Sequence, residues 1–327
     1  MTITRVETLF GTGVASAIGR TPLVPLRQVV PMEAAEVRVK LESRNPGGSV
    51  KDRAALFIIR QAEAEGRLVP GRVLLDASSG NTGIALAMLC AARGSDCEIC
   101  MPASASPQCR ELLQRYGARV VDTDPEEGSD GAIREARRRA AAEPERYFYA
   151  DQYNNPANVE AHFRTTAPEI WEATEGRITH FVAILGTSGT FVGTGTRLRE
   201  LGPGVELVSV QPDSPFHGIE GAKHMASALV PGIHRPEVAD RTISVRTEEA
   251  QAMARRLTRE EGLLAGPSGG ANVVAALQVA EELPQDALVV PVLPDGGERY
   301  PDEPWWNAEG PEPGRRGCTS GPGPSGP

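Results

Sequence analysis

Short apolar runs alternate with longer helical patterns along most of the chain. The short runs are rich in Val, Ile and Leu and are bounded by turn residues, which is typical of buried strands. We predict strands at residues 37–41, 73–75, 98–101, 118–121, 146–149, 181–185, 205–210 and 287–293. Helical patterns cover residues 54–66, 84–92, 107–116 and 247–261. This alternation predicts an α/β fold with mainly parallel sheets.

The length of 327 residues favours two doubly wound domains, and the polar stretch at residues 151–158 is the expected crossing point between them. Gly and Pro are frequent beyond Glu303, so we expect a disordered tail over residues 304–327. Trp305 and Trp306 could dock the first part of that tail on the body, or could be incidental. Lys40 alternates with apolar neighbours, which places it on the outward face of a half-buried strand.

The charge balance excludes several classes of partner. Lys and Arg number 34 and Asp and Glu 43, giving a net charge of −9, and no dense basic cluster interrupts this balance. Nucleic acid and anionic membranes are therefore not expected partners. No apolar run approaches the roughly 20 residues of a membrane-spanning helix, and residues 1–20 lack a continuous apolar core. These features predict a soluble cytoplasmic protein.

Five cysteines, an odd number in a chain of this size, fit a reducing compartment. Cys97 and Cys100 resemble a redox or zinc pair, but in a strand their side chains would point to opposite faces. The five histidines are scattered along the chain. We therefore predict no metal site.

Lysine is rare in this chain. Only Lys40, Lys51 and Lys223 are lysines among the 34 basic residues. Arginine keeps its proton, whereas lysine can lose one and form a Schiff base, so a retained lysine suggests amine chemistry. Lys51 follows the turn at residues 45–48 and opens a helix, where Ser49 and Asp52 have the spacing of a capping box.

Three loops, rich in Gly or hydroxyl residues, each follow a predicted strand and precede a helix. Residues 186–190 offer backbone amides and hydroxyls to an anion, although an ordinary tight turn would also fit. Residues 78–83 form a second nest, suited to a carboxylate or serving only as a helix cap. Residues 266–270 would present Ser268 out of a turn. With Lys51, these loops supply what a pyridoxal phosphate enzyme needs: an anchor for phosphate, a clamp for an amino acid and an amine.

These motifs together resemble the cysteine synthase family, most closely its B branch. The resemblance runs from Gly19 to Tyr300 and rests on residues 19–23, 45–53, 78–83, 151–156, 186–190, 266–270 and 297–300. It implies a homodimer of fold type II, the tryptophan synthase β-like architecture, with two doubly wound domains. The small mobile domain would comprise residues 40–154 with residues 1–11. Residues 12–39 and 155–303 would form the large domain, which binds pyridoxal 5'-phosphate.

The resemblance also implies roles for individual residues. Lys51 would hold the cofactor as an internal aldimine and then act as the base at Cα. Asn81 would bond the ring hydroxyl of the cofactor, and Ser268 would face its pyridine nitrogen. The phosphate would be bound by Gly186, Thr187, Ser188, Gly189 and Thr190, and the substrate carboxylate by Ser78, Ser79, Gly80, Thr82 and Gln152. The sequence departs from the usual family pattern at Ser78, Ser188, Pro267 and Gly269.

The activity implied is β-replacement on O-acetylserine or O-phosphoserine, through an α-aminoacrylate, with a sulfur nucleophile to give L-cysteine, a transferase reaction of class EC 2.5.1. Thiosulfate, a thiocarboxylate carrier protein, homocysteine or an amine could replace sulfide in a specialised amino-acid pathway. A catalytically silent regulatory partner with the same fold is the alternative of another class. Gly221 and Lys223 belong to a loop that the resemblance places at the mouth of the site. There Lys223 would bind an anionic group on the substrate.

Overall fold

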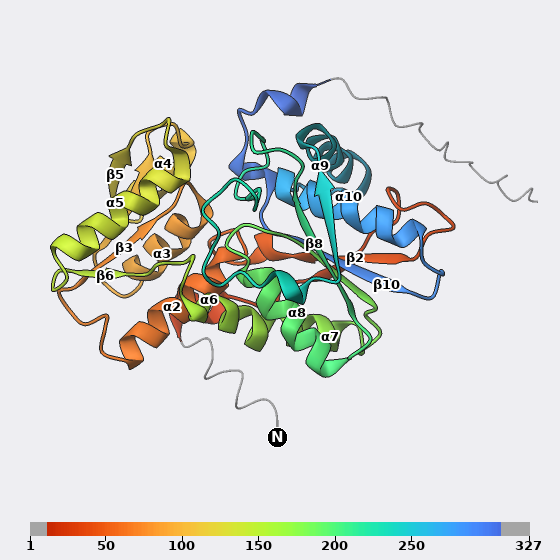
Figure 1. Cartoon of the computed structure of the whole chain (residues 1–327), viewed down its shortest axis with the longest axis horizontal. Coiled ribbons are helices and arrows are strands. Elements are labelled where there is room, and N and C mark those ends of the chain that lie inside the picture. The colour runs from red at the N-terminus through yellow and green to blue at the C-terminus, as the bar shows by residue number, and fades with distance from the viewer. Residues whose placement is uncertain (1–11, 309–327) are drawn as a thin grey trace, which may run out of the picture.

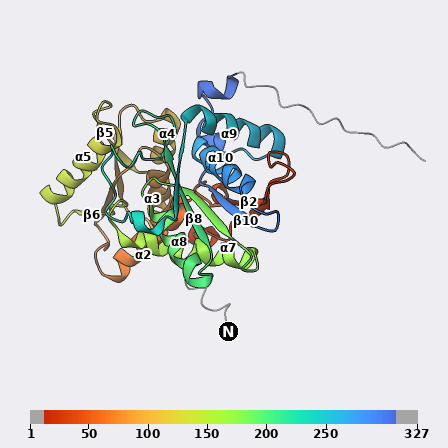
Figure 2. The ribbon, with the colours of Figure 1, turned by 45° about the vertical axis from the view of Figure 1, so that its right-hand side comes forward.

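The computed structural model describes residues 12–308, which fold around two sheets (Figures 1 and 2). The expectations for residues 1–11 and 309–327 lie outside the described residues. The larger sheet has the strand order β1-β2-β10-β7-β8-β9 and the smaller sheet has the order β5-β4-β3-β6. The proposed division into two domains assigns most of each sheet to a different domain, although its boundary at residue 40 cuts through β2.

Strands of the larger sheet come from both ends of the described chain. They are β1 (Leu23–Pro25), β2 (Glu36–Leu41), β7 (His180–Ile184), β8 (Glu206–Pro212), β9 (Arg241–Val245) and β10 (Leu288–Leu293). Every pairing is parallel except that of β1 with β2. In Figure 1, α9 (Thr247–Glu261) and α10 (Pro267–Glu281) lie on one face of this sheet, and α7 (Ala167–Ala173) and α8 (Gly189–Leu201) lie on the other. Because helices cover both faces, β10 is apolar along its whole length and β7 is apolar after His180, as the sequence predicted.

The smaller sheet consists of parallel strands β3 (Val73–Ala77), β4 (Cys97–Pro102), β5 (Arg119–Thr123) and β6 (Tyr147–Tyr149). One face packs against α2 (Lys51–Ala64), α3 (Asn81–Ala91) and α4 (Pro107–Arg115), and the other packs against α5 (Gly128–Ala142). Cys97 belongs to the first of these cores and Cys100 to the second, so the two thiols face opposite sides as predicted.

A continuous helical segment connects the two sheets. It begins as α6 (Pro156–Ala161), passes through a π-helical turn at His162–Thr166 and continues as α7. Short 3-10 helices at Gly13–Ala17, Glu42–Arg44, Pro236–Val238, Gly297–Arg299 and Pro304–Asn307 complete the described chain. Since α2 and α6 share one apolar core, the small sheet is packed on this segment.

A buried charge network lies beneath the start of α2, and it corrects one expectation. Lys40 does not face outward: its side chain is 1% exposed and donates to Glu169 and to the Thr21 carbonyl. Arg53 bonds Glu42 and Glu169 from the same cluster, and neither Arg53 nor Glu42 is exposed. The alternating pattern predicted a solvent-exposed face for Lys40. In the structure α7 covers this face of the sheet and brings Glu169 next to Lys40.

This network makes a prediction about acid stability. Burial alone would raise the pKa of Glu42, but Arg53 and, more weakly, Lys40 lower it to about 2 from the usual 4.5. The stabilisation is therefore complete above about pH 5 and is lost as the pH falls from 4.5 towards 2, to a total of about 3 kcal/mol. Urea unfolding of the protein and of Glu42→Gln at pH 7, 5, 4 and 3 would measure this loss. An equal slope in both proteins between pH 5 and pH 3 would contradict the assignment to Glu42.

The start of the tail is ordered rather than disordered. Pro304–Asn307 form a 3-10 helix in which Trp305 is 7% exposed and packs against Ala254 and Tyr300. Arg255 donates to the Trp305 carbonyl, and the indole N–H of Trp306 donates to the Tyr300 carbonyl. The packing of these two large aromatic side chains, with the Trp306 N–H hydrogen-bonded, thus orders the first residues of the expected tail.

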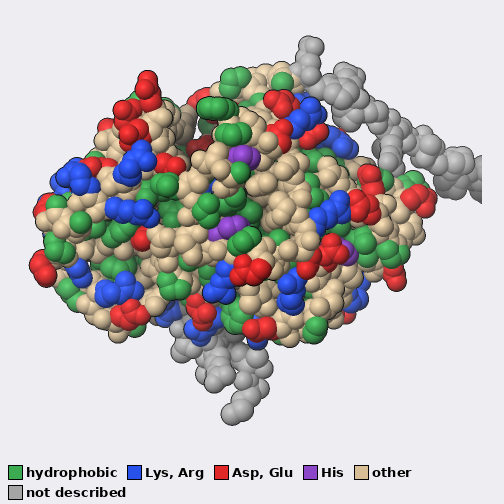
Figure 3. Space-filling model, viewed as in Figure 1, with side chains coloured by type: hydrophobic (Ala, Val, Ile, Leu, Met, Phe, Trp, Pro, Cys, Tyr) green, Lys and Arg blue, Asp and Glu red, His purple; other side chains and the backbone are tan. Residues whose placement is uncertain are grey.

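The surface shows no dominant charge on the side viewed in Figure 3, where basic and acidic side chains are interspersed. Within residues 12–308, no helix is long and apolar enough to cross a membrane.

Candidate active site

Two adjoining cavities lie where strands of both sheets end at their carboxyl edges. Both are lined by Lys51, Asn81, Gly186, Thr187, Glu220 and Gly221. The loop after β3 supplies the hydroxyl-rich wall, and the loop after β7 supplies the glycine-rich wall. The third predicted loop, residues 266–270, follows α9 instead of a strand and is joined to the loop after β10 by an isolated bridge between Ala265 and Gly296. All three loops nevertheless meet at these cavities, as expected for an α/β ligand site.

Lys51 is the first residue of α2 and lines both cavities. The Ser49 hydroxyl accepts from the Lys51 backbone N–H at 3.2 Å, while the Asp52 carboxylate reaches back to the Gly47 N–H. The predicted capping box is therefore not formed, since Val50 is the N-cap of α2 and Asp52 bonds a residue two positions before Ser49. The Lys51 ε-amino group makes no hydrogen bond or ion pair with any residue in the described range. Burial lowers the pKa of Lys51 against the opposing charges of Asp295 and Glu42, which favours the neutral, nucleophilic amine.

Residues 186–190 form a cradle at the start of α8. A Cβ on Gly186 would come within 2.3 Å of the Gly221 carbonyl oxygen, and one on Gly189 within 2.0 Å of Asn158 Oδ1, so both positions require glycine. Ser188 has φ of +71°, the left-handed conformation that glycine adopts most easily, and its hydroxyl bonds His234 Nδ1 at 3.0 Å. The Gly189 N–H donates to Thr187 Oγ1, and the next N–H groups of the first turn of α8 remain for an anion.

Ser268, Asp295 and Asn81 surround the far end of the second cavity. Ser268 lies in the first turn of α10 and is buried, and its hydroxyl bonds no other described residue. Asp295 Oδ2 accepts from Asn81 Nδ2 and from the Tyr300 hydroxyl, both at 2.7 Å, whereas its buried Oδ1 has no partner within the described residues. Burial raises the pKa of Asp295. Asn81 thus faces this carboxylate as well as the cavity.

The hydroxyl-rich wall combines residues 78–82 with Gln152. Ser78 Oγ accepts from the N–H groups of Gly80 and Gly83, which shapes the start of α3. The Thr82 hydroxyl donates to Gln152 Oε1 at 2.6 Å, and Gln152 donates in turn to the Ala77 carbonyl. Ser78, Ser79, Gly80, Thr82 and Gln152 all line the first cavity. These internal hydrogen bonds hold the wall in a fixed arrangement at the cavity.

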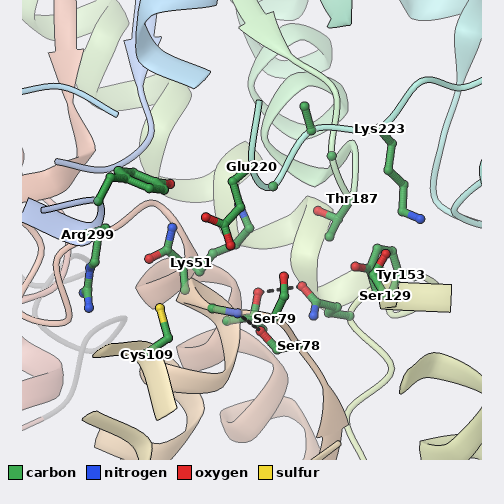
Figure 4. Close-up of a pocket in the computed structure, with 18 residues that line it drawn as sticks. Lys51, Ser78, Ser79, Cys109, Ser129, Tyr153, Thr187, Glu220, Lys223 and Arg299 are labelled. Carbon is green, nitrogen blue, oxygen red and sulfur yellow. Dashed lines mark hydrogen bonds between the residues drawn. The ribbon is translucent and has the colours of Figure 1, made fainter. Parts of the chain in front are cut away.

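Several residues that were not predicted as site residues also line the first cavity: Cys109, Ser129, Tyr153, Glu220, Arg299 and Tyr300. Figure 4 shows Glu220 on the wall opposite Ser78 and Ser79. Burial, together with the charges of Asp295 and Glu303, raises the pKa of Glu220 to about 7. Burial also raises the pKa of the Cys109 thiol, which keeps it in the thiol form. No periodic pattern marks these residues, because they come from loops and helix ends.

Lys223 is buried in the wall at one end of the cavity, beside Tyr153 (Figure 4). Its Nζ lies 3.2 Å from Asp130 Oδ1, at the start of α5, and 5.1 Å from the centre of the Tyr153 ring. The second oxygen of Asp130 accepts from the backbone N–H of Leu229 in the same loop. Lys223 therefore faces the cavity as expected, but with a counter-ion that the sequence did not indicate.

The donor set fits pyridoxal 5'-phosphate. A cradle of backbone N–H groups closed by glycines, an unpartnered amine and an unpaired buried hydroxyl lie around connected space, with the hydroxyl-rich wall beside them. In residues 12–308, no group of three or more His, Cys, Asp or Glu side chains is placed to hold a metal ion.

Comparisons with known proteins agree with this geometry. A family model described as "Pyridoxal-phosphate dependent enzyme" matches residues 14–295. A "Cysteine synthase" of Aquifex aeolicus is 49% identical over 86% of this chain and 88% of that protein, and "Cysteine synthase B" of Escherichia coli is 42% identical over 86% and 92%. The crystal structure of a cysteine synthase from Entamoeba histolytica aligns with a TM-score of 0.87 at 34% identity, covering 92% of each chain.

Proposed function

Because the chain belongs to the family of pyridoxal-phosphate dependent enzymes, we propose that it is a cysteine synthase, which replaces the activated hydroxyl of an O-activated L-serine with a sulfur nucleophile. The observation that carries this proposal is the unpartnered amine of Lys51 between an anion cradle and a hydroxyl-rich wall. The cofactor, when bound, supplies an electron sink for breaking bonds at Cα and Cβ of an amino acid.

Each wall has a role in holding the cofactor. Lys51 would be its covalent attachment point, residues 186–190 would bind its phosphate, and Asn81 and Ser268 would contact its ring. A neutral hydroxyl at Ser268 cannot hold a proton on the pyridine nitrogen as a carboxylate would, which favours prompt elimination over long-lived carbanion chemistry. Asp295 holds the Asn81 amide in place through Oδ2.

The hydroxyl-rich wall would receive the substrate carboxylate. Ser79 and the N–H groups at the start of α3 offer donors to an anion. The Thr82 hydroxyl donates to Gln152 Oε1 and so holds Gln152 on this wall. Lys51, once released, is the group placed to take and return the proton at Cα, since its pKa is lowered. The presence of Lys51, Asn81, Gln152 and Ser268 together favours an active enzyme over a silent relative with the same fold.

The test is a product assay with the full chain loaded with pyridoxal 5'-phosphate. O-Acetylserine and O-phosphoserine are each paired with sulfide, thiosulfate, homocysteine and an amine, and the amino-acid products are separated and quantified. We expect L-cysteine from an O-activated serine and sulfide. Absence of any β-replacement product from all pairs would reject the proposal.

The charge at Lys223 bears on the choice of substrate. We propose that this ammonium receives an anionic group, the phosphate of O-phosphoserine or the distal sulfonate of thiosulfate, in exchange for Asp130. A charge-assisted contact in a closed site is worth roughly 1.5 to 3 kcal/mol. Lys223→Ala should therefore lower kcat/KM for the anionic substrate about 10-fold to 150-fold and change kcat/KM for O-acetylserine with sulfide little.

Asp130→Asn is the matched variant, because it removes the competing charge and keeps the shape of the side chain. It should raise kcat/KM for the anionic substrate a few-fold, in the direction opposite to Lys223→Ala. Equal losses for every substrate pair in Lys223→Ala, or no change in either variant, would show that Lys223 does not select substrates.

The assembly and location are proposals of the same kind. We propose a homodimer, testable by light scattering on the loaded protein, and a cytoplasmic location, since the four cysteines in the described range are free and buried. We further propose a sulfur-carrier protein with a thiocarboxylate end as an alternative donor, to be added to the product assay.

A further inference from the structure

His162 lies directly behind the anion cradle, in the π-helical turn between α6 and α7. Its side chain is buried, with Nε2 3.2 Å from Thr190 Oγ1 and Nδ1 2.8 Å from Thr166 Oγ1. Thr190 lines the second cavity from the first turn of α8, so the ring bridges an interior threonine and a cavity threonine. π-Turns within helices are frequent at functional sites.

Tight packing fixes this bridge in place. Gly193, one turn along α8 from Thr190, lies so close to the π-turn that a Cβ there would be 2.9 Å from His162 Cβ and 2.2 Å from the Val159 carbonyl oxygen. The imidazole therefore has little freedom to move relative to Thr190. Burial, helped by the positive charge of Arg53, lowers the pKa of His162 to about 3, so the ring is neutral and carries one N–H.

The hydrogen-bond partners of Thr166 decide which ring nitrogen carries the proton. Thr166 is fully buried, and within the described residues the His162 ring is its only side-chain hydrogen-bond partner. A buried hydroxyl proton without an acceptor is costly, so Thr166 donates to Nδ1. The ring proton is then on Nε2, which donates to Thr190 Oγ1. The Thr190 hydroxyl proton is left without an internal acceptor.

We propose that His162 is a positioning residue, which donates from Nε2 to Thr190 Oγ1 and thereby directs the Thr190 hydroxyl proton to the phosphate group of the cofactor. This inference rests on the proposed placement of that phosphate at residues 186–190. With the opposite tautomer, Thr190 would donate to the ring and would present only lone pairs to an anion. His162 therefore acts on phosphate affinity through Thr190 and touches neither cofactor nor substrate.

The test compares a ligand with and without the phosphate. Apoprotein prepared from the full chain is titrated with pyridoxal 5'-phosphate and with pyridoxal, and the dissociation constants are read from absorbance. His162→Met should raise the Kd of pyridoxal 5'-phosphate about 10-fold or more and leave that of pyridoxal unchanged. His162→Gln, whose amide N–H replaces the Nε2 donor, should restore part of the affinity.

A double-mutant cycle separates positioning from a purely structural role. Because His162 acts through Thr190, His162→Met should have no further effect on Kd in a Thr190→Val background. Additive effects, equal weakening of pyridoxal, or an unchanged Kd in His162→Met would each overturn the inference. If His162→Met does not fold, Thr166→Val carries the same cycle, since it removes the hydroxyl that holds the ring tautomer.

Failure of the proposed function would look different. In that case, the unaltered apoprotein would not bind pyridoxal 5'-phosphate, or the loaded protein would make no β-replacement product. Normal loading and product formation with no coupling between positions 162 and 190 would reject only the role of His162.

Discussion

Lys51→Ala is expected to lose covalent cofactor and turnover together. The Lys51 amine is the one amine that lines both cavities in the described chain, and arginine could not form the same bond. Loss of both the attachment point and the base at Cα should lower kcat at least about 1,000-fold. Assay of cysteine formation measures the rate, and the mass of the borohydride-reduced protein shows whether the cofactor is attached.

Lys223→Ala is the matched control for this experiment, since it removes the other lysine of the same cavity. That variant should keep the added cofactor mass and its absorbance. The Lys51→Ala protein should also unfold at a temperature close to that of the unaltered apoprotein, because the ε-amine makes no hydrogen bond that would be lost. Retention of the cofactor mass and of turnover in Lys51→Ala would overturn the assignment.

Arg53→Met should destabilise the fold by about 3 to 5 kcal/mol at pH 7. Arg53 bonds Glu42 and Glu169, and its loss would leave the fully buried Glu42 carboxylate with Thr21 and Asn45 as its remaining hydrogen-bond donors. Denaturant unfolding measures the change. The difference in unfolding free energy between the variant and the unaltered protein should become smaller near pH 4, because Glu42 can take up a proton in the variant.

Two further variants test whether the loss comes from the buried charge. Glu42→Gln combined with Arg53→Met should recover part of the stability, since it removes the uncompensated carboxylate. Arg177→Met is the control, because Arg177 is 53% exposed and lies 3.9 Å from its partner Glu36, so it should change stability by less than about 1 kcal/mol. Similar losses in Arg53→Met and Arg177→Met would exclude a special role for the buried network.

The sequence predicted all strands of the smaller sheet and the interior of the larger sheet, but it missed the two edge strands of the larger sheet. All eight predicted strands are present, since buried parallel strands are continuous apolar runs that stand out from their surroundings. β1 and β9 were not predicted. Both are edge strands, β1 spans three residues and ends in Pro25, and β9 buries only Ile243 and Val245. A strand of three residues and a strand with two buried positions give only a weak pattern.

At the candidate site, the sequence found the residues that belong to motifs and missed those that depend on distant partners. Lys51 and the loops at residues 78–83 and 186–190 were found because a rare lysine and runs of glycine or hydroxyl residues are visible locally. The counter-ion of Lys223 comes from Asp130, 93 positions away, and the histidine behind Thr190 comes from a turn 28 positions earlier. Such pairs follow from packing and leave no mark on the local sequence.

The scarcity of lysine limits the side-chain amines with which the cofactor can react. Pyridoxal 5'-phosphate is an aldehyde, and an aldehyde condenses with any accessible primary amine. Here Lys40 is sealed in an ion pair, Lys223 is covered in the cavity wall, and arginine occupies nearly all the other basic positions of the chain. Neither of the other two lysines is exposed on the outer surface as a competing amine. Lys51 is therefore the side-chain amine with which the free aldehyde can condense.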